Sequence, residues 1–190
     1  MKYHTCSTNV KFRWDQVGNA IFQRYPNPWS KHVLTEDVIS RKLEGPILKT
    51  VRLISKTNKL PKLANKFVSN SSGYVVEESH VNAKEKTAVT YTRNLTFPHI
   101  MVCEEKCTFS ISQESKNWTM LKRESWISSS LYGFSKAAEM FGMERYKKNI
   151  KKSLKGLNYV LSKMYVPEKI PTTIGMTLPQ PIPQATCSSS

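Results

Sequence analysis

The sequence predicts an α+β fold in which a seven-stranded antiparallel sheet grips one long C-terminal helix. Seven segments alternate apolar and polar residues and follow one another with short turn-like breaks. Alternation of this kind indicates half-buried strands, and such short connections join antiparallel hairpins rather than parallel crossovers. A helical pattern without proline then runs from 130 to 165. One helix and one sheet must bury their apolar faces on each other, and the space between them can be packed or hollow.

The elements follow in a simple order along the chain. Residues 2–12 are predicted to form the first strand, and Trp14 to Tyr25 a short helix with Val17 and Ile21 on one side. Pro26 and Pro28 end this helix, because proline cannot continue it. Six further strands are then predicted, over residues 32–43, 47–56, 74–82, 86–97, 100–112 and 117–128.

The C-terminal helix is predicted to carry two apolar stripes. Phe134, Ala138 and Phe141 recur at helical spacing and start the first stripe. The second stripe is made of Tyr146, Ile150, Leu157, Leu161 and Met164. We interpret the first stripe as part of the inner face.

Three polar residues continue the direction of the first stripe. At about 100° per residue, Arg145, Asn149 and Lys152 point the same way as Phe134 and Phe141. Two interpretations remain open. Arg145 and Lys152 border the core and reach water along their apolar stems, or they hold an anion beside an oily cavity. Removing a cation from water costs free energy unless an anion pairs with it.

The segment from Asn58 to Gly73 loses all periodicity. Its sequence, NKLPKLANKFVSNSSG, mixes apolar residues with lysines, which suits contact with an anionic membrane surface. Connections of this length are often lids or binding loops, although an ordinary surface excursion fits the pattern equally well. The residues concerned are Lys62, Leu63, Lys66 and Phe67.

Composition favours one basic globular domain with a tail. We expect a domain over 1–165 and a mobile, proline-rich tail over 166–190. The formal net charge of +15 favours an anionic partner, which can be nucleic acid, a membrane surface or an acidic protein. The sequence contains no run of 18 apolar residues, which is the length that would predict a membrane span. The first residues show no pattern of a cleaved targeting signal.

No motif in the sequence supports catalysis or metal binding. The four histidines lie in different segments, and neither a nucleophile elbow, a Walker loop nor a zinc-type cysteine pattern occurs. We therefore expect no enzymatic activity, no cofactor and no metal. Glu105 and Arg93 interrupt otherwise apolar faces, so we expect that they pair with each other or lie at an edge.

Several motifs resemble those of one known family. Arg24-Tyr25-Pro26-Asn27-Pro28, followed by Ser30-Lys31-His32-Val33-Leu34, is similar to the opening signature of the PRELI-like (PRELI/slowmo) family. Matching segments follow in the same order and include RLISKTNKLP, Tyr91-Thr92-Arg93-Asn94 and Asn149-Ile150-Lys151-Lys152-Ser153. The resemblance covers about residues 1 to 165, and SKHVLTED and WISSSLYGFS bring it closest to the PRELI branch.

This resemblance implies a fold and a function. Family members have a seven-stranded sheet wrapped around a long helix, and they enclose a lipid cavity under a mobile loop. They work in the mitochondrial intermembrane space with a small helical partner built on twin Cx9C motifs. They carry phosphatidic acid from the outer to the inner membrane for cardiolipin synthesis. We therefore expect phosphatidic acid and anionic membrane surfaces as partners, and no nucleic acid.

The resemblance also implies the residues of the site. By position, the head-group residues fall on Arg24, His32, Lys56, Lys59, Arg145, Asn149 and Lys152, and the lid on about 61–72. Three of them are the helix residues that the angular analysis selects independently. Two rival hypotheses remain: transfer of phosphatidylserine by the same fold, and a basic nucleic-acid-binding module.

Overall fold

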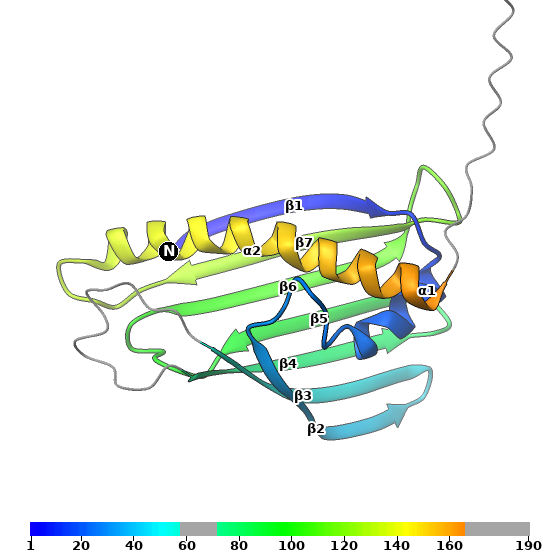
Figure 1. Cartoon of the computed structure of the whole chain (residues 1–190), viewed down its shortest axis with the longest axis horizontal. Coiled ribbons are helices and arrows are strands. Elements are labelled where there is room, and N and C mark those ends of the chain that lie inside the picture. Colours follow the sequence, from blue (N-terminus) through cyan, green and yellow to red (C-terminus); the bar gives the residue numbers. More distant parts are fainter. Residues whose placement is uncertain (58–71, 166–190) are drawn as a thin grey trace, which may run out of the picture.

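The seven predicted strands form one antiparallel sheet. The computed structural model describes residues 1–57 and 72–165. The strands are β1 (Lys2–Val10), β2 (Val33–Glu44), β3 (Ile47–Thr57), β4 (Ser72–Asn82), β5 (Thr87–Asn94), β6 (Val102–Ile111) and β7 (Thr119–Ser128). Their order in the sheet is β1-β7-β6-β5-β4-β3-β2, so only β1 leaves the simple meander (Figure 1).

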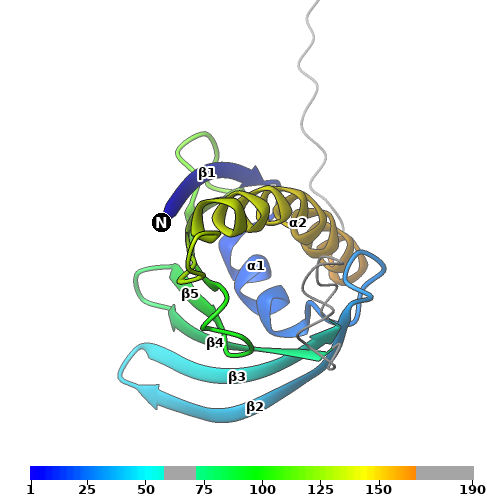
Figure 2. The same ribbon diagram turned by 90° about the vertical axis from the view of Figure 1, so that its left-hand side faces the viewer.

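Two helices lie within the curve of the sheet (Figure 2). The short helix α1 (Trp14–Ala20) continues as a 3-10 turn, η1 (Ile21–Gln23), and the long helix α2 spans Ser135–Met164. This arrangement confirms the predicted α+β class. Helix α2 begins five residues later than predicted, because residues 131–134 form a turn in which Gly133 has a φ of 74°.

The inner face of the sheet is layered along its strands. Residues paired in the register lie side by side, so inward residues from β7 to β3 form rungs across the sheet. One apolar rung contains Leu121, Phe109, Ala88, Val81 and Leu48. The next contains Arg123, Cys107, Thr90, Ser79 and Thr50, and the following one contains Ser125, Glu105, Thr92, Glu77 and Arg52. The fourth contains Ile127, Cys103, Asn94, Val75 and Ile54. The second and third rungs form a polar band between two mainly apolar ends.

The contiguous apolar core occupies the end of the molecule near α1. Most of its buried members come from the end of β1 and the residues after it, α1 with η1, and the first apolar rung, and Cys107 of the second rung adds to them. The last turns of α2 contribute Leu157, Val160 and Leu161. At the other side of the polar band, Ile54, Val75, Ile127 and Met143 are buried outside this cluster. The polar band therefore separates the core from a second apolar region beneath the first half of α2.

The two apolar stripes predicted for α2 have different outcomes. Leu157 and Leu161 of the second stripe are buried, and its other members, Tyr146, Ile150 and Met164, are half-buried. The first stripe does not form part of a buried inner face, since Phe134 is 68% exposed and Phe141 is 42% exposed. That part of the prediction was wrong. Small side chains, not the phenylalanines, set the closest approach of α2 to the sheet.

Two glycines bring α2 close to the rest of the molecule. A Cβ on Gly142 would lie 2.5 Å from Met101 Sδ and 3.0 Å from Ile127 Cγ2, and a Cβ on Gly156 would lie 2.7 Å from Asn27 Oδ1. A larger residue at either point would force a neighbouring side chain or the helix to shift. Among the helices within 1–57 and 72–165, none has an apolar stretch long enough to traverse a bilayer.

Candidate anion-binding site

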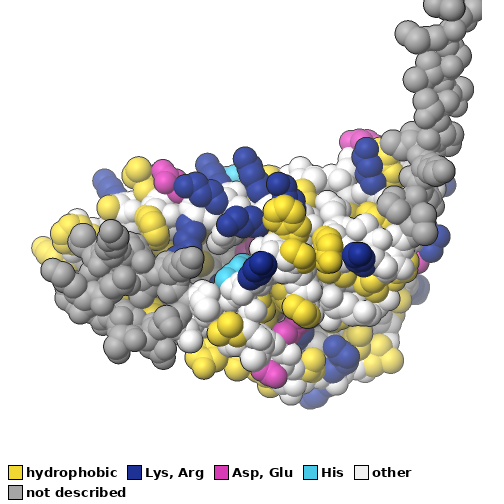
Figure 3. All heavy atoms as spheres, viewed as in Figure 1, with side chains coloured by type: hydrophobic (Ala, Val, Ile, Leu, Met, Phe, Trp, Pro, Cys, Tyr) yellow, Lys and Arg dark blue, Asp and Glu magenta, His cyan; other side chains and the backbone are white. Residues whose placement is uncertain are grey.

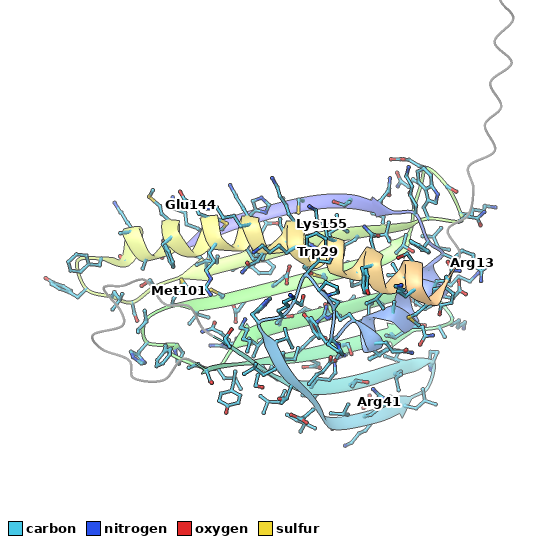
Figure 4. The ribbon with its side chains drawn as sticks, in the orientation of Figure 1. Arg13, Trp29, Arg41, Met101, Glu144 and Lys155 are labelled. Carbon is cyan, nitrogen blue, oxygen red and sulfur yellow. The ribbon has the colours of Figure 1, made fainter. Side chains whose placement is uncertain are left out.

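The segment after η1 forms a tight turn against α2. Asn27 donates through Nδ2 to the Arg24 carbonyl at 2.6 Å, and its Oδ1 accepts from the Trp29 amide at 2.9 Å. The Tyr25–Pro26 peptide bond is cis. Lys155 of α2 lies over the ring of Trp29 with its Nζ 4.9 Å from the centroid (Figure 4). These contacts fix where Arg24 and His32, at the two ends of the turn, stand relative to α2.

The antiparallel pairing of β2 with β3 brings His32 beside Lys56. His32 precedes β2, and its carbonyl accepts a hydrogen bond from the Thr57 amide at 2.8 Å. Val33 is paired with Lys56 in the register. Two basic residues that are distant in sequence therefore meet at one end of the sheet.

Helix α2 adds two cations to this group. The positive charges of Arg145 and Lys152 act on His32, together with that of Lys56. Arg145 is half-buried and Lys152 is exposed. Figure 3 shows Lys and Arg side chains gathered along the α2 face of the molecule, with a histidine next to them. We call His32, Lys56, Arg145 and Lys152 the cation cluster.

The pKa values of two residues in the cation cluster are lowered by burial and by neighbouring positive charge. Partial desolvation lowers the pKa of His32, and the positive charges of Lys56, Arg145 and Lys152 lower it further. Desolvation also lowers the pKa of Lys56, and Arg145 adds to this effect, while Cys103 and Glu105 oppose it. A bound anion would relieve both effects, because it favours the protonated forms of the two groups. The arrangement is therefore suited to an anionic ligand.

Asn149 lies on α2 between Tyr146 and Ser153, the two residues that hydrogen-bond to the sheet, and its side chain is exposed. It shares one side of the helix with Tyr146 and Ser153, which are half-buried and hydrogen-bonded to sheet residues. Solvent therefore reaches this stretch of α2 near the cluster. Asn149 is placed to offer an amide donor to a ligand that enters there.

Arg24 is held in a buried ion network and does not stand in the open cluster. Arg24 pairs with Glu77, Glu77 also pairs with Arg52, and Arg52 pairs with Glu36. Burial alone would lower the pKa of Arg24, but the charge of Glu77 outweighs it and raises the value above its ordinary range. Arg24 Nε is buried and has no hydrogen-bond partner among the described residues, so one donor is available to a ligand. Its role in head-group binding stays a prediction.

A second ion network joins the sheet to α2. Arg123 Nη1 donates to Glu105 Oε1 at 2.8 Å, and Arg123 Nη2 donates to Ser153 Oγ at 3.2 Å. The Tyr146 hydroxyl also donates to Glu105 Oε1, at 2.8 Å. The expectation that Glu105 pairs with Arg93 was wrong: Arg93 pairs with Glu104 on the outer face, 3.4 Å away.

Some predicted residues lie outside the described part of the chain. These are Lys59 of the head-group set, the lid residues Lys62, Leu63, Lys66 and Phe67, and the tail 166–190. Sequence reasoning missed Arg52, Glu77 and Arg123. Strand alternation held a usable signal, because each occupies an inward position between residues expected to be buried.

Two surface hollows of about 380 Å³ are lined by other residues. One is bounded by η1 and β2 and includes Phe22, Val38 and Arg41. The other is lined by residues that include Tyr91, Glu104 and Trp126. Neither hollow includes a member of the cluster.

Sequence comparisons place the chain in one family. Residues 15–167 match the PRELI-like family. The chain is 44% identical over 167 residues to "PRELI domain-containing protein 1, mitochondrial" from Gallus gallus, covering 86% of this chain and 78% of that protein. It is 42% identical over 168 residues to the Homo sapiens protein of the same name, covering 86% and 77%. It is also 36% identical over 151 residues to "Protein UPS1, mitochondrial" from Saccharomyces cerevisiae, covering 78% and 86%.

Solved structures share the fold at low sequence identity. The crystal structure of TTHA0849 from Thermus thermophilus matches with a TM-score of 0.59 and 11% identity, covering 86% of this chain and 99% of that chain. The crystal structure of Ara h 8.0201 matches with a TM-score of 0.52 and 11% identity, covering 85% and 99%. These likenesses concern the fold alone.

Proposed function

Because this chain belongs to the PRELI-like family, we propose that it is a mitochondrial lipid-transfer protein that carries phosphatidic acid from the outer to the inner membrane, in support of cardiolipin synthesis. It would work in the intermembrane space, as a heterodimer with a small helical partner carrying twin Cx9C motifs. The observation that carries the proposal is the cation cluster, in which segments far apart in the sequence bring four basic residues together.

The physical demands on a lipid carrier are compatible with this structure. A diacyl lipid carries roughly 30 methylenes at about 0.8 kcal/mol each, so free passage through water costs more than about 20 kcal/mol. A carrier must therefore shield the chains and replace the water around the phosphate with cations and donors. The apolar residues beyond the polar band, Ile54, Val75, Ile127 and Met143, are buried, and we expect the acyl chains to be shielded beside them.

The charge around the cluster favours a phosphomonoester over a head group that carries an amine. Among the described residues, the inward carboxylates already have cationic partners: Glu77 pairs with Arg24 and Arg52, and Glu105 pairs with Arg123. The ammonium group of phosphatidylserine would meet positive charge here, while phosphatidic acid adds only negative charge. This supports phosphatidic acid as the cargo.

The turn before α2 and the start of the helix offer a surface for approach to a membrane. Tyr132 and Phe134 are exposed, and Met140 and Phe141 extend this apolar surface along the helix. Exposed lysines follow on α2, among them Lys147, Lys148 and Lys151. Apolar tips next to basic residues suit an anionic bilayer, which attracts each lysine by about 1 kcal/mol.

A direct test is lipid transfer between liposomes by the purified complex with its helical partner. Donor liposomes would contain labelled phosphatidic acid, phosphatidylserine or phosphatidylcholine, and native mass spectrometry would identify the bound lipid. We expect transfer of phosphatidic acid at least tenfold faster than that of the other two lipids. Preferential transfer of phosphatidylserine would assign the cargo to that lipid instead, and tight RNA or DNA binding without lipid uptake would overturn the proposal.

A further inference from the structure

We propose that the ion pair of buried Arg123 with half-buried Glu105 acts as a positioning device, which fixes the rotation of α2 so that Arg145 and Lys152 face His32 and Lys56. This inference rests on the proposed function, because it concerns how the cations of the head-group site are held. Arg123 is 8% exposed, and its partner Glu105 lies in the same polar band on the neighbouring strand.

The pair bonds α2 at two points that are seven residues apart. Glu105 accepts the Tyr146 hydroxyl at 2.8 Å, and Arg123 donates to the Ser153 hydroxyl at 3.2 Å. Seven residues are close to two full turns, so both bonds lie on the same side of the helix. Two directional bonds on one side hold a helix against rotation, whereas one bond would act as a pivot.

The two bonded residues directly follow the two cations. Arg145 precedes Tyr146, and Lys152 precedes Ser153. Each cation therefore stands about 100° around the helix from a fixed residue. A rotation of 20° would move side-chain atoms at a radius of about 6 Å by about 2 Å. That displacement is enough to break a hydrogen bond to a phosphate oxygen.

The close contacts at the two glycines of α2 do not supply the same control. Gly142 and Gly156 lie 14 residues apart on either side of the bonded pair and set how close α2 comes to Met101 and Asn27. A close contact at a residue without a side chain limits distance but tolerates rotation. A buried ion pair is also a weak source of stability compared with apolar residues of the same volume. The Arg123–Glu105 pair therefore contributes the rotational orientation of α2 rather than stability.

The decisive variant is the double substitution Tyr146→Phe/Ser153→Ala. It removes both bonds to α2 and leaves the Arg123–Glu105 pair in place. The matched control is Tyr159→Phe/Ser162→Ala, which makes the same chemical changes elsewhere on the helix, where Ser162 bonds the Tyr159 carbonyl at 2.9 Å. Thermal denaturation confirms that both variants fold.

Two measurements report on the position of the cations. The first is the pKa of His32 by NMR titration without lipid, with the signal assigned by a His32→Gln variant. Arg145 and Lys152 help to lower this pKa, so it should rise towards its ordinary value in the decisive variant and stay unchanged in the control. The second is the ratio of phosphatidic acid to diacylglycerol bound from liposomes by the complex, which should fall about tenfold in the decisive variant.

The outcomes separate the two proposals. An unchanged His32 pKa, or an unchanged ratio of the two lipids, in the folded decisive variant would overturn the positioning role. If the wild-type complex binds neither lipid, the proposed function fails, and the His32 titration alone then decides whether the pair orients α2.

Discussion

The side chain of Asn27 occupies the place that a Cβ on Gly156 would need, with Asn27 Oδ1 2.7 Å from that position. The same Oδ1 accepts the Trp29 amide, so the turn that carries Arg24 and His32 is built directly on the backbone of α2. The glycine is needed for this contact, not for helix flexibility.

The first prediction concerns this contact. Gly156→Ala should destabilise the protein by about 1–3 kcal/mol, even though alanine favours a helix over glycine by up to about 1 kcal/mol. Chemical denaturation measures the change. The matched control is Gly18→Ala in α1, where a Cβ would meet its nearest neighbour at 4.0 Å, so this variant should be as stable as wild type or more so. Equal stabilisation by both substitutions would contradict the claim that the Asn27 contact requires glycine at position 156.

The second prediction concerns the cation cluster. Lys152→Ala should lower the affinity for phosphatidic acid by about tenfold or more, since a hydrogen bond to a charged group contributes about 1.5–3 kcal/mol. The fold should stay intact, because Lys152 is exposed. Lys151→Ala removes an equal charge from a neighbouring exposed position and should have little effect. Liposome transfer compares the two, and equal losses would mean that only the net charge matters.

The third prediction concerns Arg24, which is held in the buried ion network. Arg24→Met leaves Glu77 buried with one partner fewer, and loss of one partner from a buried pair costs about 3–5 kcal/mol. We therefore expect a clear drop in the denaturation midpoint as well as lower lipid transfer. The double variant Arg24→Met/Glu77→Leu still contains the Arg52–Glu36 pair and should recover much of the stability. Full wild-type stability of Arg24→Met would refute this.

The fourth prediction concerns acid stability. Burial alone would raise the pKa of Glu77, but Arg24 and Arg52 outweigh it and hold the value below its ordinary 4.5. A carboxylate with a lowered folded-state pKa adds stability that is present above pH 4.5 and is lost as the pH falls through the folded value. The stability difference between wild type and Glu77→Gln should therefore be largest near neutral pH and shrink in acid. Denaturation curves from pH 7 to about pH 3 test this. A difference that does not depend on pH would exclude the ion network as its cause.

The fifth prediction concerns membrane approach. Replacing Tyr132 and Phe134 with serine should weaken binding to anionic liposomes about tenfold, because each aromatic ring contributes up to about 3 kcal/mol when fully buried and only part of each would be buried here. Stability should not change, since both side chains are exposed. Co-sedimentation with liposomes measures the effect. A suitable control is Tyr91→Ser on the outer face of the sheet, which should leave binding unchanged.

Strand positions were predictable from sequence because alternation reports directly on which face of a strand is buried. The register was not, and it decides the ionic contacts. Arg93 lies opposite Glu104 and not Glu105, and Glu77 lies opposite Arg52. Spacing along one strand carries no information about which residue stands across from it.

The second half of α2 was predictable, whereas its first half was not. Both halves have apolar residues at helical spacing, but Gly142 determines which side of the first half approaches the sheet. Phe134 and Phe141 then remain exposed. An apolar stripe shows that a surface avoids water, and it does not show whether protein or membrane covers it.

The polar band lies between two groups of apolar residues that can change independently as the sequence evolves. Apart from Cys107, which lies in the band, the residues of the contiguous core lie on one side of it, and Ile54, Val75 and Met143 lie on the other. Under the proposed function, substitutions among these three would alter the length or the saturation of the fatty acids that are accepted, while the contiguous core stays unchanged. Selection can thus act on cargo preference and on fold stability through largely separate sets of residues.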